Sequence, residues 1–340
     1  MRRSTAIARP LCRNTCPSAG TEFHAADVVQ TFLDGAAPGS ALARDWTADG
    51  LHTVCVQETV ISVDVAETRR RTNRLRRYVK RTLLDGDEFI CPHFKACRDS
   101  IKPGHQFREG TMSHVGRSLD LVLNGKPLRV MVVGQESGLP KDPSSPWASK
   151  VGMTARSHQV HDVTGLHKRY YAEPGHPARN PHMRGTTSLL RTVFSKGLGD
   201  DYEGELITSV NGNPFHIFDG FALVNRLLCS AGPIKTSQGR PTRTMLDNCA
   251  THFEATVSIL EPTLVILQGS LVAKSVSDVL MRRRTYSEYL HEAQLGAHRM
   301  LVCSFSHPSA HGAVRWGDQP RSAYMQEVVV PTLRAALRRG

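Results

Sequence analysis

The sequence predicts a three-layer α/β/α protein whose central sheet has four parallel strands. In the C-terminal two-thirds of the 340 residues, short apolar runs alternate regularly with segments of helical periodicity. Each apolar run is continuous, which is typical of parallel strands that are covered by helices on both faces. The repeated order of strand and helix favours such a sheet, because parallel strands need a crossover element between them.

The expected elements follow one another along the chain. The strands are residues 128–134, 221–228, 264–269 and 300–305, and the helices are residues 187–197, 244–260, 270–283 and 319–338. Pro262 is expected to end the second helix, because the residue before a proline disfavours helical backbone. Residues 141–179 are rich in Pro, Ser, Gly, His and Arg without periodicity. They are expected to form a long loop, and loops of this length are often functional.

The charge of the chain favours a polyanionic partner such as DNA. The formal net charge is +12, and each Lys or Arg that meets a phosphate releases condensed counterions. Residues 69–81 (RRRTNRLRRYVKR) are expected to form a basic helix that either faces DNA or exposes a solvated face; both interpretations stay open. We expect residues 1–85 to form a partly disordered N-terminal extension that carries this helix, and residues 86–340 to form the α/β domain.

The chain is expected to be a cytoplasmic monomer that does not enter a membrane. Its apolar runs fall short of the ~18 residues that a membrane span requires. Residues 1–20 lack the apolar region of a secretory signal, which points to a reducing compartment. Paired cysteines in such a compartment indicate a metal site more than disulfides.

Distinctive polar residues fall at the ends of three expected strands. The turn GQESG (residues 134–138) follows the first strand, Asn225 lies within the second, and His-Pro-Ser (residues 307–309) follows the fourth. In open parallel sheets, ligands bind where the strands end at their carboxyl edge. These residues are therefore expected to converge on one site.

Taken in order, these motifs resemble the uracil-DNA glycosylase superfamily, in which a strand leads into a Gly-rich turn and a later strand leads into His-Pro-Ser. The resemblance is closest to the iron–sulfur branch, where an Asn stands four residues before a cysteine, as Asn225 does before Cys229. A Pro/Arg-rich loop then leads to Cys249, which opens a helix. Cys91 and Cys97 match a close cysteine pair before the first strand. The resemblance covers about residues 89–338 and implies a uracil-DNA glycosylase-like fold.

The resemblance also implies a [4Fe–4S] cluster on Cys91, Cys97, Cys229 and Cys249. Ligation by four thiolates suits iron–sulfur and zinc alike, so spacing alone leaves zinc open. The chain departs from the branch in its wider upstream pair and in GQESG, where the acid comes one position later. His182 takes the place of an aromatic residue that stacks on the flipped base.

The candidate residues suit cleavage of an N-glycosidic bond, which passes through an oxocarbenium-like sugar and an anionic base. His307 is expected to donate a hydrogen bond to the departing base. Glu136 and Gln135 are expected to orient water or stabilise the cation, and Asn225 to read the base edge with its amide. The base-binding set also includes His182, Gly134 and Ser309.

The sequence therefore predicts a DNA glycosylase that hydrolyses uracil, or a related deaminated base, from DNA. One alternative is a catalytically weak relative that binds DNA or a lesion and keeps its metal as a structural clamp. A second is a zinc-stabilised DNA-binding module without enzymatic activity. The preferred base, and the choice between single- and double-stranded DNA, stay open.

Overall fold

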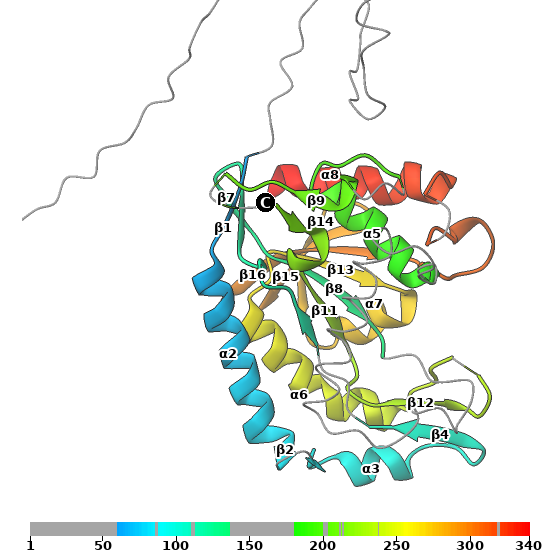
Figure 1. Ribbon diagram of the computed structural model, residues 1–340. Coiled ribbons are helices and arrows are strands. Elements are labelled where there is room, and N and C mark those ends of the chain that lie inside the picture. The colour runs from blue at the N-terminus through cyan, green and yellow to red at the C-terminus, as the bar shows by residue number, and fades with distance from the viewer. Residues whose placement is uncertain are drawn as a thin grey trace, which may run out of the picture. The chain divides into compact units, whose positions relative to one another are not determined.

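The computed structural model describes most of the chain from residue 60 to residue 340 (Figure 1). The described residues are 60–85, 88–109, 113–136, 180–199, 203–210, 212, 214–236, 238–317 and 320–340. The predicted extension up to residue 59, the last two residues of the GQESG turn and the predicted loop 141–179 lie outside them. None of the helices in the described ranges has the length and apolar composition that crossing a membrane requires.

A seven-stranded mixed sheet forms the centre of the fold. In sheet order its strands are β14 (Met281–Thr285), β15 (Leu290–Leu295), β16 (His298–Phe305), β13 (Leu264–Gln268), β8 (Val130–Gly134), β11 (Phe221–Asn225) and β5 (His114–Val115). β8 pairs in parallel with β11 and β13, and β13 with β16, whereas β14, β15 and β5 add antiparallel pairs. The predicted α/β class is confirmed, but the sheet is wider than the predicted four parallel strands and is mixed.

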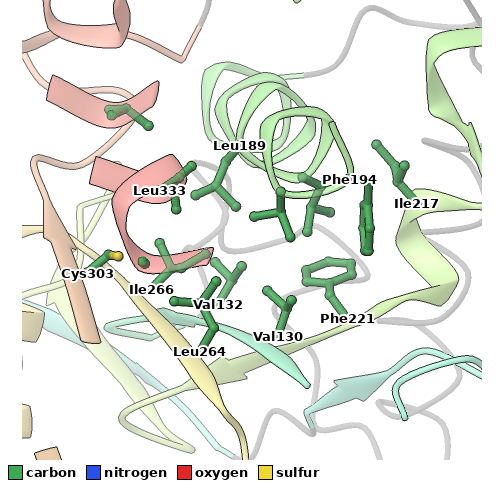
Figure 2. Packing of buried hydrophobic residues seen from close by; sticks show 14 of the residues in the cluster. Val130, Val132, Leu189, Phe194, Ile217, Phe221, Leu264, Ile266, Cys303 and Leu333 are labelled. Carbon is green, nitrogen blue, oxygen red and sulfur yellow. The ribbon is translucent and has the colours of Figure 1, made fainter. Parts of the chain in front are cut away.

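Helices pack on both faces of this sheet. Val130 and Val132 of β8 point into a core shared with α5 (Pro181–Val193) and α8 (Val330–Arg339), as the packed side chains in Figure 2 show. Met131 and Val133 point the other way, into a core shared with α6 (Arg243–Leu260) and α7 (Ser270–Val276). Burial on both faces explains why the central strands read as continuous apolar runs.

Shorter elements surround the sheet. They are β1 (Ile61–Val63), β2 (Leu84–Asp85), β3 (Glu88–Phe89), β4 (His105–Arg108), β6 (Leu121–Leu123), β7 (Lys126–Leu128), β9 (Leu206–Ile207), β10 (Phe215–His216), β12 (Ser230–Pro233), α3 (Phe94–Asp99) and the 3₁₀ turns η2 (Glu203–Glu205), η3 (Ile217–Asp219) and η4 (Gly312–Val314). β4 and β12 pair with each other near α3, at the bottom of Figure 1.

The predicted basic helix is α2 (Val65–Thr82), which lies beside α6 (Figure 1). One of its arginines is buried: Arg71 forms ion pairs of 2.9 Å with Asp120 and with Glu261. α2 is thus held in the same compact unit as the sheet, although the predicted extension includes it. Most of its other cations, such as Arg76 and Arg77, remain exposed.

Two predicted helices differ from the structure for physical reasons. α5 begins at Pro181 rather than at residue 187, because the Asn180 side chain caps it by accepting from the Met183 N–H and proline suits a first helical position. The predicted helix 270–283 ends at Val276, and its last residues belong to the edge strand β14. Every residue of β14 is exposed, so its sequence carries no alternation from which a strand could be predicted.

The final helix contains a π-helical turn. The predicted segment 319–338 forms η5 (Tyr324–Val329), followed by α8. Pro331 has no N–H to donate to the carbonyl four residues earlier, and its ring would clash with that carbonyl in a regular α-helix. The widened turn before Pro331 accommodates this change.

Candidate active site

The ends of β8 and β11 bring the first group of candidate residues together. The parallel register pairs Asn225 with Gly134. The pairing continues beyond the strands, since Leu227 N–H donates to the Gln135 carbonyl oxygen at 2.8 Å. A Cβ atom on Gly134 would lie 3.3 Å from Asn225 Oδ1, so the glycine leaves room for this amide over the strand end.

The loop after β16 holds the second group, and its backbone is fixed at several points. Trp316, which is fully buried, donates from Nε1 to the Ser306 carbonyl oxygen at 3.0 Å. Ser306 N–H donates to Tyr324 Oη at 3.0 Å, and Gly317 N–H donates to the Pro308 carbonyl oxygen at 2.9 Å. His307, between these anchored residues, is therefore held at the carboxyl edge of the sheet.

The protonation state of His307 follows from its surroundings. The Ser309 N–H donates to His307 Nδ1 at 3.1 Å. Surrounding protein atoms remove part of the ring's hydration and lower the pKa of His307, although the residue remains accessible to solvent. The ring is therefore neutral at neutral pH, and because Nδ1 is the acceptor we infer that Nε2 carries the proton. His307 can thus offer an N–H donor to a ligand at this edge.

His182 stacks on His307, with ring centroids 5.5 Å apart and planes inclined by 18°. This contact depends on close packing of α5 against the loop. A Cβ atom on Gly185 would lie 2.7 Å from Pro308 Cβ, so a larger residue would push the helix away. The structure thus brings the predicted stacking residue and the predicted donor together.

The carboxyl group of Glu136 is shielded beneath the segment before α6. Both of its oxygens are buried, and neither has a hydrogen-bond partner within the described part of the chain. A Cβ atom on Gly239 would fall on the Glu136 carboxyl group, which shows how closely this segment covers it. Burial raises the pKa of Glu136 to about 8, and the nearby Ala231 N–H offsets only part of this effect. Glu136 is therefore mainly protonated at neutral pH.

Replacement of Glu136 by glutamine is expected to remove a pH dependence of stability. Between the ordinary glutamate pKa and about 8, folded protein keeps a proton that unfolded protein releases. Stability of the wild type should therefore fall as pH rises through this window and level off above it. Glu136→Gln lacks this decline. The free energy of unfolding of the variant, relative to that of the wild type, should therefore increase by about 3–5 kcal/mol between pH 4 and pH 9. Urea unfolding at several pH values measures this difference.

The control for this experiment is Glu254→Gln, which changes an exposed glutamate on α6. It should follow the wild-type curve. Parallel curves for wild type and Glu136→Gln would show that the Glu136 carboxyl group is hydrated and ionised, contrary to the structure.

The candidate residues thus form two groups along one edge. His307 and Ser309 follow β16 and are joined by His182 of α5, whereas Gly134, Gln135 and Asn225 lie at the ends of β8 and β11. β13 separates β16 from β8, so Gly134 and Gln135 stand about 10 Å, or two strand spacings, from the end of β16, and Asn225 on β11 stands about 14 Å, or three spacings, from it.

The four candidate cysteines gather in a separate part of the fold. Cys91, Cys97, Cys229 and Cys249 are all buried in one apolar cluster, built around α3, the start of β12 and the first half of α6. Cys91 Sγ lies 3.5 Å from His252 Nε2, and Asn248 Nδ2 donates to Cys97 Sγ at 3.4 Å. The Asn248 amide can support a thiolate at Cys97, and His252 can do the same at Cys91 in the tautomer that carries its proton on Nε2.

The cysteine cluster is not a preformed site for a single ion. In the described ranges, no three His, Cys, Asp or Glu side chains are arranged so that they could hold a metal ion. Burial raises the pKa of Cys91 and raises that of Cys249 to about 11, so these thiols are protonated as they stand. The donor set has the composition of a four-thiolate site, and ligation would have to release these protons.

Sequence reasoning missed a buried amide at the same edge. Gln268 is the last residue of β13 and is fully buried. The only signal was a glutamine at the end of an otherwise apolar strand, LVILQ. Gly269 follows it with a φ of +125°, a backbone conformation that favours glycine and turns the chain into α7. Gln268 therefore lies between the His307 group and the Asn225 group.

Comparison with known proteins adds no family to these observations. A scan against protein-family models found no match for the chain, and a search of curated proteins found none either. The side chains at the carboxyl edge of the sheet are therefore the basis for assigning a function.

Proposed function

We propose that the protein is a DNA glycosylase that hydrolyses the N-glycosidic bond of uracil or a related deaminated base. The observation that carries this proposal is the neutral His307 ring at the strand edge, which offers an N–H donor and is stacked on His182. Loss of a pyrimidine base leaves negative charge that is delocalised onto its carbonyl oxygens, and a fixed neutral donor stabilises that charge as it develops. An imidazolium could give up its proton instead, so a lowered pKa suits this role.

The other residues of the edge have complementary roles in this proposal. Asn225 is positioned over Gly134, and its amide can donate to and accept from a base edge at once. His182 provides a flat ring beside His307. Glu136 can orient water as a carboxylate only when it is ionised, which requires a pH near or above 8 or a shift of the covering segment. The Gln135 backbone, tied to Leu227, is the alternative support for the water.

We further propose a uracil-DNA glycosylase-like fold with β16, β13, β8 and β11 at its centre. In the same proposal, Cys91, Cys97, Cys229 and Cys249 hold a [4Fe–4S] cluster. The burial of four cysteines in one apolar cluster supports this, as do the amide donor of Asn248 at Cys97 Sγ and the ring nitrogen of His252 beside Cys91 Sγ. Such a group would link the strand β12 region to α3 and α6 and stabilise the fold there. Zinc is the alternative occupant of the same sulfurs.

Single-turnover assays on labelled oligonucleotides test the activity. Purified protein is incubated with strands that contain one uracil, hypoxanthine or xanthine, in single- and double-stranded form, and abasic sites are then cleaved with alkali. The proposal expects cleavage at the deaminated base in at least one context. Absence of abasic product in every context would contradict it.

A second candidate function is binding of DNA or a lesion without efficient catalysis. The observation that favours it is the shielded, protonated carboxyl group of Glu136, since a closed cover over this residue leaves no ionised group to assist the reaction. Under this candidate, the oligonucleotide assay gives no product while the protein retains preference for the damaged strand in a binding assay.

DNA affinity is expected to fall steeply with salt, because a chain of charge +12 should neutralise several phosphates. With about four phosphate contacts, log K against log salt should have a slope of about −3 to −4. Fluorescence anisotropy with an undamaged duplex measures the slope. A slope near zero would show that binding does not neutralise phosphate charges, and would contradict electrostatic binding of DNA.

Two charge-matched variants then locate the contact. One replaces Arg69, Arg76 and Arg77 on α2 by glutamine, and the other replaces Arg282, Arg283 and Arg284 on β14. All six side chains are exposed, so both variants lose equal charge with little effect on packing. A slope that becomes less negative only in the first variant assigns DNA contact to α2, and an unchanged slope assigns its charges to a solvated face.

A further inference from the structure

Gln268 belongs to a chain of hydrogen bonds that ends beneath His182. Its Nε2 donates to Thr186 Oγ1 at 3.1 Å. Thr186 Oγ1 in turn donates to the His182 carbonyl oxygen at 3.0 Å. Gln268 and Thr186 are both completely shielded from solvent, so water cannot substitute for either bond.

This chain lies where α5 is docked on the sheet edge. Residues 182, 185 and 186 share one face of the first turns of α5, as their helical spacing requires. His182 contacts the His307 ring, Gly185 packs on Pro308 and Thr186 contacts Gln268. The position of the His182 ring relative to His307 is thus set by β13 through Thr186, as well as by the loop after β16.

An apolar residue would be more usual than glutamine at position 268. Leu264 and Ile266, the residues of β13 on the same face, are buried in the apolar core with α5. Gln268 continues this face, yet its Oε1 is buried without a hydrogen-bond partner in the part of the chain that the structure describes. A buried unpaired carbonyl destabilises the fold, and a leucine would avoid this cost. Among the described residues, the glutamine therefore gains the bond to Thr186 at a cost in stability.

We propose that Gln268 is a positioning residue for the active site: through Thr186 it fixes the first turn of α5 and thereby the stacking of His182 on His307. This inference rests on the proposed glycosylase function, because it assigns to Gln268 a role in base excision. Gln268 touches neither base nor sugar in this account. It acts only through Thr186 and His182.

The test compares six variants by their single-turnover rates on the preferred deaminated substrate. Gln268→Leu and Thr186→Val should each slow base release by about 10- to 100-fold, the usual effect of misplacing a reacting group by about 1 Å. The double variant should be no slower than either single variant, because both break the same chain. Thr186→Ser keeps the hydroxyl group and should retain the wild-type rate. In a His182→Ala background, Gln268→Leu should have no further effect.

Thr192→Val is the matched control, because Thr192 Oγ1 donates to the Ser188 carbonyl oxygen on the same helix at 3.0 Å, in the same kind of bond. It should keep the wild-type rate. A readout that needs no activity is the NMR resonance of the His307 ring in protein with ¹³C-labelled histidine. Gln268→Leu and Thr186→Val should shift this resonance as His182→Ala does, and Thr192→Val should leave it in place.

The outcomes separate the two proposals. Wild-type protein that releases no base contradicts the glycosylase function, while the His307 resonance still tests the positioning role. Active wild-type protein, with Gln268→Leu at full rate and an unshifted His307 resonance, overturns the role of Gln268. Additive losses in the Gln268→Leu/Thr186→Val double variant would also overturn it, since independent effects indicate general destabilisation.

Discussion

His307→Ala is expected to lower the single-turnover rate of base release by about 10²- to 10³-fold while leaving DNA affinity nearly unchanged. The hydrogen bond from His307 to the base forms in the transition state rather than in the bound ground state. The Nε2–H of a neutral His307 meets a departing base only as negative charge develops on it, so its removal destabilises the transition state and not the bound ground state. Rapid-quench assays with excess enzyme give the rate, and anisotropy gives the affinity.

The control is a histidine at the opposite end of the same strand. His298 begins β16, and its Nε2 is bonded to the Pro262 carbonyl oxygen at 2.7 Å, at the amino edge of the sheet. His298→Ala should keep the wild-type rate after correction for folded fraction. Equal losses in both variants would indicate destabilisation of the strand, and a His307→Ala protein of full activity would exclude His307 as the donor.

Cys249→Ala is expected to abolish bound iron and most of the soluble yield. Anaerobically purified wild-type protein should be brown, because thiolate-to-iron charge transfer gives iron–sulfur clusters a broad visible absorbance. Cys249 lies on the buried face of α6 within the cysteine cluster, so loss of its thiolate removes ligation energy that is also folding energy. Iron, sulfide and zinc analyses of purified protein measure the outcome.

Cys303→Ala separates ligation from packing. Cys303 is fully buried in β16, in the core with α5 and α8 rather than in the cysteine cluster, so its loss leaves a small cavity but no missing ligand. This variant should keep its iron. One zinc and no iron in the wild type would contradict the iron–sulfur proposal and favour the zinc-stabilised module. Equal iron loss in both variants would show that packing defects suffice.

The central strands were predictable from sequence because burial on both faces leaves a continuous apolar run, as in β8 and β13. The hairpin of β14 and β15 was not, since β14 is exposed throughout and its arginines show no strand periodicity. Its pairing is decided by β15, where Leu290 and Ala293 are buried against the sheet. Tertiary contact, rather than local pattern, determines this edge.

The candidate site was predictable only where residues directly follow strands. His307 and Asn225 fall at the sheet edge because parallel strands end there, and His182 contacts the His307 ring from α5. The shielding of Glu136 depends on the segment at Gly239, about a hundred residues later, which no local pattern indicates. Gln268 was missed because its partner, Thr186, lies on a helix eighty-two positions earlier in the chain.

The most direct measurement of the glycosylase claim is the amount of free base released per abasic site, determined by mass spectrometry on one uracil-containing strand. Wild-type and His307→Ala proteins, purified identically, are compared over the same time course. Wild-type protein should release equal amounts of free uracil and abasic strand, and His307→Ala should form both products at least about 100-fold more slowly. No free base above the protein-free control, or equal release by both preparations, would contradict the glycosylase claim.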